Sequence, residues 1–255
     1  MDTLIQLWKT FFDWQSMRES LPEMLTVGLP NTLILALLSA ALGTAIGMLL
    51  AVAGISRTRW LRWPARVYTD IFRGLPVVVT ILLIGLGLAP VALALWGTNP
   101  YPLGILALAL VAGAYIGEIF RSGIQSVDRG QVEAARALGF SYPTAMRLVV
   151  IPQGIRRVLP ALVNQFIALV KDSSLVYFLG LLASQRELFR IGQDYAANTG
   201  NESALLLAGL FYLVLTVPLT HLVNFIDLRL RSGRPEPSPD PAPSTAGDLS
   251  EVTPR

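Results

Sequence analysis

The stretch GLPVVVTILLIGLGLAPVALALWGTNPYPLGILALALVAGAYIG, residues 74–117, contains no charged side chain. A helix needs about 20 predominantly apolar residues to cross the hydrocarbon core of a bilayer, so this stretch is long enough for two spans. The turn between them is WGTNPYP, residues 96–102, because its glycine and prolines stop a helix. The sequence therefore predicts an integral membrane protein built from helical spans.

Composition supports this fold class and excludes several functions. Hydrophobic residues make up 53% of the chain, charged residues 15%, and the mean hydropathy is +0.55. No cysteine is present, which excludes disulfides, thiol nucleophiles and cysteine-ligated metals, and the single histidine, His221, leaves no cluster for a metal site. The pI of about 9.4 does not indicate nucleic-acid binding, because the arginines lie at the ends of apolar segments. No cleaved signal peptide is predicted, since the N-terminus lacks a basic region followed by a small-residue cleavage site.

Five apolar segments predict an all-α polytopic membrane protein with about five transmembrane helices. They run over residues 25–55, 70–96, 101–121, 149–182 and 204–230. The fourth is too long for one straight span and is interrupted by Pro152, Pro160 and the charged pair Lys171-Asp172. We expect it to form a helix followed by a bent or re-entrant piece.

Arginines near the span ends predict the orientation, because basic residues of short loops stay on the cytoplasmic side. They gather in the loop after the first segment, in residues 126–148 and at the end of the last segment, whereas the opposite loops are uncharged or balanced. The N-terminus is therefore expected outside, and residues 126–148 and the C-terminus in the cytoplasm. We divide the chain into an N-terminal interfacial segment (1–20), a transmembrane domain (21–231) and a disordered, proline-rich cytoplasmic tail (232–255).

A polar insert, SVDRGQVEAARALGFSYPTAMRLVVIPQ, separates the third and fourth segments at residues 126–153. Its helix-forming residues end at Gly139, which suits a C-terminal cap, and a second short helix can begin at Ser141 with Pro143 in its first turn. One interpretation is a solvated hairpin that only links two spans. The other is a docking element for a cytoplasmic protein.

The residue pattern favours docking. EAARALG, residues 133–139, followed by VVIP at 149–152, resembles the EAA loop of ABC-importer permeases, whose coupling helix docks into a groove of the ATPase subunit. PNTL at 30–33, FRGLP at 72–76 and IPQGIRRVLPALVNQFIALVKDSSL at 151–175 are similar to the polar amino-acid permeases, the histidine/glutamate/glutamine/arginine/opine family of binding-protein-dependent inner-membrane components. The resemblance implies the type I importer permease fold in a bacterial inner membrane. It assigns ATPase coupling to Gln131, Glu133, Ala134, Ala135, Gly139, Phe140, Tyr142 and Pro152.

The residues also exclude an ATPase. A phosphate-binding P-loop needs a glycine-rich turn that ends in Lys and then Ser or Thr, but Lys9 has no glycine before it and Lys171 is followed by Asp172. The chain is therefore not expected to be an enzyme or to bind a cofactor, and ATP and Mg belong to a separate subunit. The expected partners are an ATPase dimer, a second permease chain in a homo- or heterodimer, an external solute-binding protein, a polar amino acid and the lipid bilayer, with no nucleic acid.

Polar residues at membrane depth indicate the pathway, because such groups are costly without a partner, water or a function. Gln153, Arg157, Asn164 and Lys171 are spaced to share one face of a helix. The alternatives stay open: Lys171-Asp172 is either a structural pair at a helix break or part of a substrate site, and Glu118 with Arg121 is either structural or a gate. The candidate pathway residues are Asn164, Lys171, Asp172, Ser173, Ser174 and Glu118.

Two other functions compete with an ATP-driven importer. An ion-gradient-driven secondary transporter could use Glu118, Lys171 and Asp172 as ion sites, but repeated halves, common in that class, are not visible. A non-transporting membrane scaffold could recruit a protein through residues 126–153, but would leave the polar face of the fourth segment unexplained. Which amino acid is carried is open in the sequence.

Overall fold

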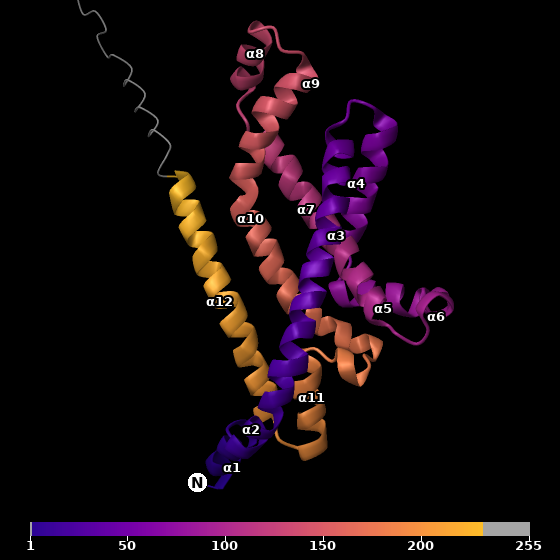
Figure 1. The fold of residues 1–255 in the computed structure, drawn as a ribbon, viewed down its shortest axis with the longest axis vertical. Helices are drawn as coiled ribbons and strands as arrows, with labels where there is room; N and C mark the ends of the chain where they lie inside the picture. The colour runs from indigo at the N-terminus through magenta and orange to yellow at the C-terminus, as the bar shows by residue number, and fades with distance from the viewer. Residues whose placement is uncertain (1, 232–255) are drawn as a thin grey trace, which may run out of the picture.

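The computed structural model describes residues 2–231, and across this range the chain is helical (Figure 1). Four helices are long and apolar enough to cross a membrane, and the bent pair of helices Arg59–Gly74 and Val77–Gly87 makes a fifth if it counts as one span, which confirms the all-α prediction. The α-helices are α1 (Asp2–Phe11), α2 (Trp14–Glu23), α3 (Leu29–Ile55), α4 (Arg59–Gly74), α5 (Val77–Gly87), α6 (Ala89–Trp96), α7 (Tyr101–Gln125), α8 (Arg129–Ala137), α9 (Tyr142–Ala145), α10 (Ile151–Asp172), α11 (Leu188–Thr199) and α12 (Ser203–Arg231). Shorter π-helical and 3₁₀ turns are η1 (Met24–Gly28), η2 (Met146–Val150), η3 (Ser173–Leu179) and η4 (Ala183–Gln185).

Helices α3 and α7 form the centre of the bundle through small residues. A Cβ added at Gly43 would lie 2.7 Å from the Cβ of Ala112, and one at Gly47 would lie 2.8 Å from Cγ2 of Ile116. Gly113 of α7 is equally tight against Ile46 of α3, at 2.6 Å. Small residues let two helix backbones approach closely where lipid supplies no hydrophobic drive for association. The glycine spacing in the first apolar segment thus serves helix packing.

The second apolar segment was predicted as one span over residues 70–96, and the structure differs in where its helices begin and bend. Helix α4 begins earlier, at Arg59, and its axis meets that of α5 at 107°. The break falls at Leu75-Pro76, where Leu75 is extended, because a proline disfavours helical geometry in the residue before it. The arginines expected in a loop therefore lie on a helix, whose buried face carries Ala65 and Thr69.

The fourth apolar segment agrees with its prediction of a helix followed by a bent piece. Helix α10 ends at Asp172, continues as the 3₁₀ turn η3 and stops at Gly180, whose φ of +70° is a left-handed conformation suited to glycine. Val176 of η3 packs against Gly104, near the start of α7, where an added Cβ would lie 2.5 Å from Val176. The end of α10 is therefore level with the beginning of α7.

The N-terminal segment contains two helices, α1 and α2. Asp13 lies between α1 and α2 and caps the start of α2, because its side chain accepts a hydrogen bond from the backbone N–H of Gln15, at 3.1 Å. The turn before α12 holds α1 through a hydrogen bond from the Glu202 N–H to the Thr10 carbonyl, at 2.9 Å. Placement of this segment in a membrane interface stays a prediction. The tail predicted at 232–255 lies outside the described residues.

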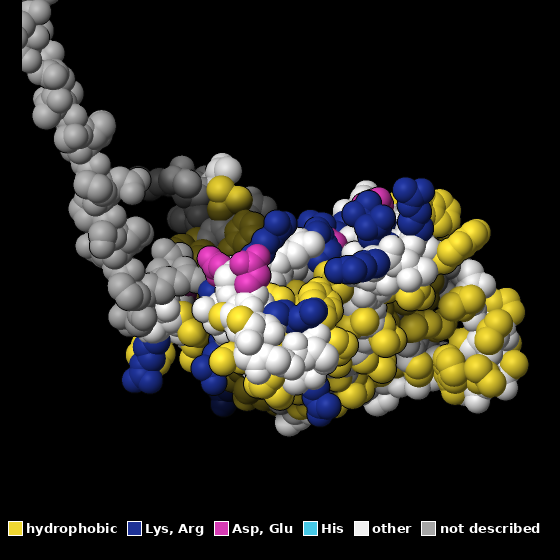
Figure 2. All heavy atoms as spheres, turned by 90° about the horizontal axis from the view of Figure 1, so that it is seen from above, with side chains coloured by type: hydrophobic (Ala, Val, Ile, Leu, Met, Phe, Trp, Pro, Cys, Tyr) yellow, Lys and Arg dark blue, Asp and Glu magenta, His cyan; other side chains and the backbone are white. Residues whose placement is uncertain are grey.

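The two ends of the bundle differ in character (Figure 1). Helices α8 and α9 lie at one end, together with the start of α4, whereas α1, α2 and α11 lie at the other. Figure 2 looks onto the end that carries α8 and α9, where Arg side chains gather among polar and apolar atoms. The structure therefore agrees with the predicted grouping of the basic residues at one end.

Candidate functional site

The polar insert folds into two short helices joined by a sharp turn. Asp128 caps the start of α8 by accepting a hydrogen bond from the Gly130 N–H, at 2.6 Å. Gly139 has a φ of +87°, which favours glycine, and the N–H groups of Gly139 and Phe140 close the helix by donating to earlier carbonyls at 3.0 and 3.1 Å. Ser141 then caps α9 by accepting from the Thr144 N–H. The predicted helix, glycine stop and second helix are all present.

Most of the predicted coupling residues face outward. Ala135 is buried, while the others on α8, the turn and α9 are exposed, and Pro152 is exposed at the start of α10. We call this set the coupling surface: Gln131, Glu133, Ala134, Leu138, Gly139, Phe140 and Tyr142. Leu138 was not among the predicted residues, although it is 80% exposed at the tip of the loop. Phe140 and Tyr142 are also exposed in this loop, and a group of exposed apolar side chains is typical of a protein docking site.

Polar contacts fix the loop to the base of two spans. Gln153 of α10 donates to the Gln131 side chain, at 3.2 Å, and the Arg157 guanidinium donates to the Ser126 carbonyl. Directly beside these contacts α7 and α10 pack closely: a Cβ added at Gly154 would lie 3.0 Å from the carbonyl oxygen of Gly123. The loop is therefore attached firmly to α7 and α10.

The predicted pathway residues of α10 lie together at its far end. Lys171 and Asn164 are exposed and seven residues apart, so they share a helix face, while Asp172 is half-buried. No salt bridge joins Lys171 to Asp172 among residues 2–231. Ser173 and Ser174 donate to carbonyls three residues back, both at 2.7 Å. These serines accordingly donate hydrogen bonds to backbone carbonyls at the end of α10.

Glu118 is not brought together with that group. It lies on α7, 14 residues beyond Gly104, which packs against Val176 of η3. At about 1.5 Å per residue, roughly 21 Å of helix separates Glu118 from that level. Glu118 instead forms a salt bridge with Arg121 at 2.6 Å and a looser one with Arg73 at 3.9 Å.

A polar cavity of about 300 Å³ surrounds Glu118, between α3, α4 and α7. Its charged lining residues are Arg66, Asp70, Arg73, Glu118 and Arg121. None of the other predicted pathway residues lines it. The sequence-based set therefore divides into two places, one at the end of α10 and one near the coupling-loop end of α7.

A buried carboxyl and its hydrogen-bond partners at the opposite end of the molecule were missed by the sequence analysis. Glu187 is 0% exposed; it caps α11 by accepting from the N–H groups of Phe189 and Arg190, at 2.6 and 2.7 Å. Tyr212 of α12 donates its hydroxyl to the same carboxyl at 2.9 Å, and Thr32 of α3 accepts from the Leu188 N–H at 3.2 Å. We call Glu187, Tyr212 and Thr32 the Glu187 cluster. It ties α11 to both α12 and α3.

Burial sets the acidity of this cluster. Burial raises the pKa of the Glu187 carboxyl to about 7, although its hydrogen bonds and the charge of Arg190 oppose this shift. In the sequence, Glu187 was counted only as one charge that balances a loop. An acidic residue just before an apolar helix is an N-cap signal and could have located the start of α11. No local signal could have shown that the carboxyl is buried against Tyr212.

Comparisons with known proteins agree with one another. The family model of the binding-protein-dependent transport system inner membrane component matches residues 43–232. The arginine transport system permease protein ArtQ of Bacillus subtilis strain 168 is 36% identical over 205 residues, 80% of this chain and 91% of the relative. The glutamate/aspartate import permease protein GltK of Escherichia coli O157:H7 is 35% identical over 224 residues, 86% of this chain and 98% of the relative.

Solved structures show the same fold. The crystal structure of an amino acid ABC transporter with histidines matches with a TM-score of 0.75 and 33% identity, covering 85% of this chain and 98% of that chain. An inward-facing structure of the MetNI methionine ABC transporter matches with a TM-score of 0.64 and 22% identity, covering 83% of this chain and 97% of that chain. At that lower identity the second likeness concerns the fold alone.

Proposed function

Because this chain belongs to the family of binding-protein-dependent transport system inner membrane components, we propose that it carries a polar amino acid across the membrane. It is a permease component of an ABC importer of the inner membrane, and ATP hydrolysis takes place on a separate subunit. We further propose a pair of permease chains, an external N-terminus and delivery of the amino acid by a solute-binding protein. Relatives named for arginine and for glutamate/aspartate support the substrate class.

The single observation that carries the coupling role is the exposed, rigidly attached loop of α8 and α9. An ATPase that engages the coupling surface would push on α8. The Gln131–Gln153 hydrogen bond and the Gly123–Gly154 contact would transmit that displacement to α10 and α7. Helix α10 is a lever of about 33 Å at 1.5 Å per residue, with the proposed substrate residues at its far end. Rocking of α10 would then expose those residues alternately to the two sides.

Asn164, Lys171 and Asp172 are proposed as the groups that a zwitterionic amino acid meets at the end of α10. Lys171 suits the substrate carboxylate and Asp172 suits its ammonium group, and no salt bridge joins the two within residues 2–231. Ser173 and Ser174 hold the helix end that presents them. Glu118 is proposed to line the pathway separately, in the polar cavity beside Arg121.

Reconstituted transport tests this function. The chain and its ATPase are placed in vesicles with the solute-binding protein, and uptake of arginine, glutamate and glutamine is measured with and without ATP. Uptake of at least one polar amino acid that requires ATP is the expected result. Uptake driven by an ion gradient without ATP would identify a secondary transporter, and ATPase binding with no uptake of any solute would identify a scaffold.

The double variant Lys171→Met/Asp172→Leu tests the pathway assignment. Single removals are uninformative, because leaving one of two neighbouring opposite charges alone at membrane depth is damaging whatever its role. The double variant keeps similar volumes and should assemble with its ATPase but lose uptake or change its substrate preference. Transport like that of the parent would show that the two charges serve structure only.

A further inference from the structure

The first half of α4 is rich in arginine. Its sequence is RWLRWPAR, residues 59–66, and no acidic residue occurs in the chain between Glu23 and Asp70. Within residues 2–231, no salt bridge reaches Arg59, Arg62 or Arg66. Arg66 also lines the polar cavity beside Asp70 and Glu118, so within residues 2–231 Arg59 and Arg62 are the guanidinium groups that this segment leaves for a ligand.

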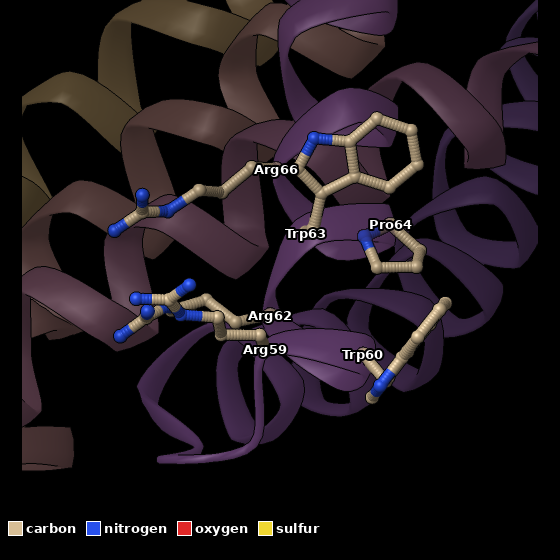
Figure 3. A pocket seen from close by; sticks show the side chains of 6 residues that line it. All are labelled: Arg59, Trp60, Arg62, Trp63, Pro64 and Arg66. Carbon is tan, nitrogen blue, oxygen red and sulfur yellow. The ribbon is translucent and has the colours of Figure 1, made fainter.

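These arginines and two tryptophans line one shallow groove on the surface of α4. Figure 3 shows the arginine side chains extending to one side of α4 and Trp60, Trp63 and Pro64 lying on the other. The three arginines are spaced by three and four residues, which places them along one face. The groove has a volume of about 430 Å³ and is lined by the same six residues.

The aromatic side of the groove is apolar surface that residues 2–231 leave uncovered. Trp60 is 89% exposed and Trp63 is 69% exposed. The opposite face of α4 is fixed to the bundle, since Ala65 and Thr69 are buried and the Tyr68 hydroxyl donates to the Leu110 carbonyl at 2.8 Å. The helix therefore cannot turn its tryptophans inward.

The groove lies at the coupling-loop end of the bundle. Helix α4 starts at that end (Figure 1), and Arg57, two residues before it, lies over the Tyr142 ring of the coupling surface at 5.7 Å. From there α4 descends beside α3 and α7, both membrane spans. Tryptophan is enriched at the level of lipid headgroups, and arginine reaches from apolar surface toward the phosphates.

We propose that this groove binds the phosphate headgroup of an anionic phospholipid of the coupling-side leaflet. Arg59, Arg62 and Arg66 hold the phosphate, because a guanidinium donates two parallel hydrogen bonds to such an anion. Trp60, Trp63 and Pro64 cover the glycerol and upper acyl region. A protein partner is less well matched, since arginines beside exposed indoles fit a ligand that is anionic at one end and apolar at the other. This inference rests on the proposed function only for the depth at which α4 lies in the membrane.

Quenching by brominated lipid tests the proposal on the full-length chain in vesicles. A background with Trp8, Trp14 and Trp96 replaced by Phe leaves Trp60 and Trp63 as the reporters. Bromine on the acyl chains of phosphatidylglycerol should quench them at a lower mole fraction than bromine on phosphatidylcholine. In Arg59→Gln/Arg62→Gln/Arg66→Gln this preference should fall at least tenfold, since each arginine contributes about fivefold near an anionic surface.

Two further variants distinguish the effect of charge at this site from an effect on folding and from an effect of the overall surface charge. Arg59→Lys/Arg62→Lys/Arg66→Lys keeps the charge and should retain most of the preference. Arg129→Gln/Arg147→Gln/Arg156→Gln removes three exposed charges elsewhere at the same end and should retain all of it. Equal loss in this control would show a general surface effect and overturn the proposal.

Other outcomes also contradict it. Equal quenching by the two lipids in the parent background excludes a headgroup site, and competition by soluble glycerol phosphate would identify a site for a free phosphate compound. If the Gln triple variant loses ATPase in a pull-down while its lipid preference is unchanged, the groove is a protein docking surface. Failure of the chain to transport any amino acid would leave the quenching result standing, because the assay needs neither substrate nor ATP.

Discussion

Helices α8 and α11 both begin with an acidic cap, but at opposite ends of the molecule and in opposite environments. Asp128 accepts one backbone hydrogen bond at the exposed start of α8, whereas Glu187 accepts two at the buried start of α11 and a third from Tyr212. Water solvates the Asp128 carboxylate, while the Glu187 carboxyl depends on protein donors alone. The same kind of N-terminal cap therefore stabilises only its own helix at the exposed end, whereas at the buried end it also joins α11 to α12.

Removal of the buried cap should have the largest effect. Glu187→Ala leaves two N–H groups and the Tyr212 hydroxyl without their acceptor in a buried site, which should lower the free energy of unfolding by about 3 kcal/mol. Denaturant unfolding in detergent micelles measures the loss. A loss no larger than about 1 kcal/mol would show that the buried cap behaves like an exposed one.

The pH dependence of stability should distinguish the two ends next. The pKa of Glu187 is raised to about 7 in the folded chain from an ordinary value of 4.5, so the folded state binds a proton that the unfolded state releases. Its stabilising contribution is complete below about pH 4.5 and is lost as the pH rises to about 7, by at most about 1.4 kcal/mol per pH unit.

Glu187→Gln cannot ionise and should lack this part of the pH dependence. The difference in unfolding free energy between parent and Glu187→Gln, measured at pH 5 and pH 7.5, should therefore shift in favour of the variant at the higher pH. A difference that stays constant between the two pH values would contradict a raised pKa.

A smaller effect is expected at the turn of the coupling loop. Gly139→Val places a branched side chain at a φ of +87°, which costs about 1–2 kcal/mol of local strain and should weaken ATPase association about tenfold. The matched control is Gly200→Val, at a φ of +66° after α11, which carries similar strain at the other end. Association measured on vesicles should be normal in the control. Equal weakening in both variants would mean that general destabilisation is the cause.

The exposed cap should give the smallest change. Asp128→Ala removes one solvent-exposed acceptor and should cost about 1 kcal/mol or less in the stability of α8. Because the loop stays attached through Gln131 and Gln153, ATPase association should fall by no more than about threefold. A loss as large as that of Gly139→Val would show that the cap, and not the glycine turn, holds the coupling surface in shape.

Sequence reasoning was accurate where the physical cause is local. The helix of residues 129–137, its glycine stop and the cap at Ser141 follow from propensities and caps that act within about four residues, and all are present. It was wrong at the second apolar segment, because length and hydropathy do not show where a helix bends. Leu75-Pro76 was visible as a break signal, but its effect on a whole span depended on how α4 packs.

The candidate site shows the same distinction between local and long-range causes. The consecutive residues Lys171 to Ser174 had to lie together, and Asn164 shares their helix by its spacing. Glu118 was grouped with them only because all are polar at membrane depth, and the packing of α7 against η3 places it about 21 Å of helix away. Leu138 was missed because an apolar residue in a helical pattern is ordinarily buried.

By itself the sequence determined a helical membrane protein, a polar insert of two short helices and the clustering of arginine at one end, because hydropathy, caps and charge act through neighbours along the chain. Only the tertiary structure decided that Glu187 meets Tyr212, 25 residues away, and that α4 turns by 107° into α5. Those contacts depend on which helix faces meet, and that is settled by close packing of the whole bundle. A buried carboxyl and an exposed one look alike in the sequence, since the difference between them is the solvent that other segments exclude.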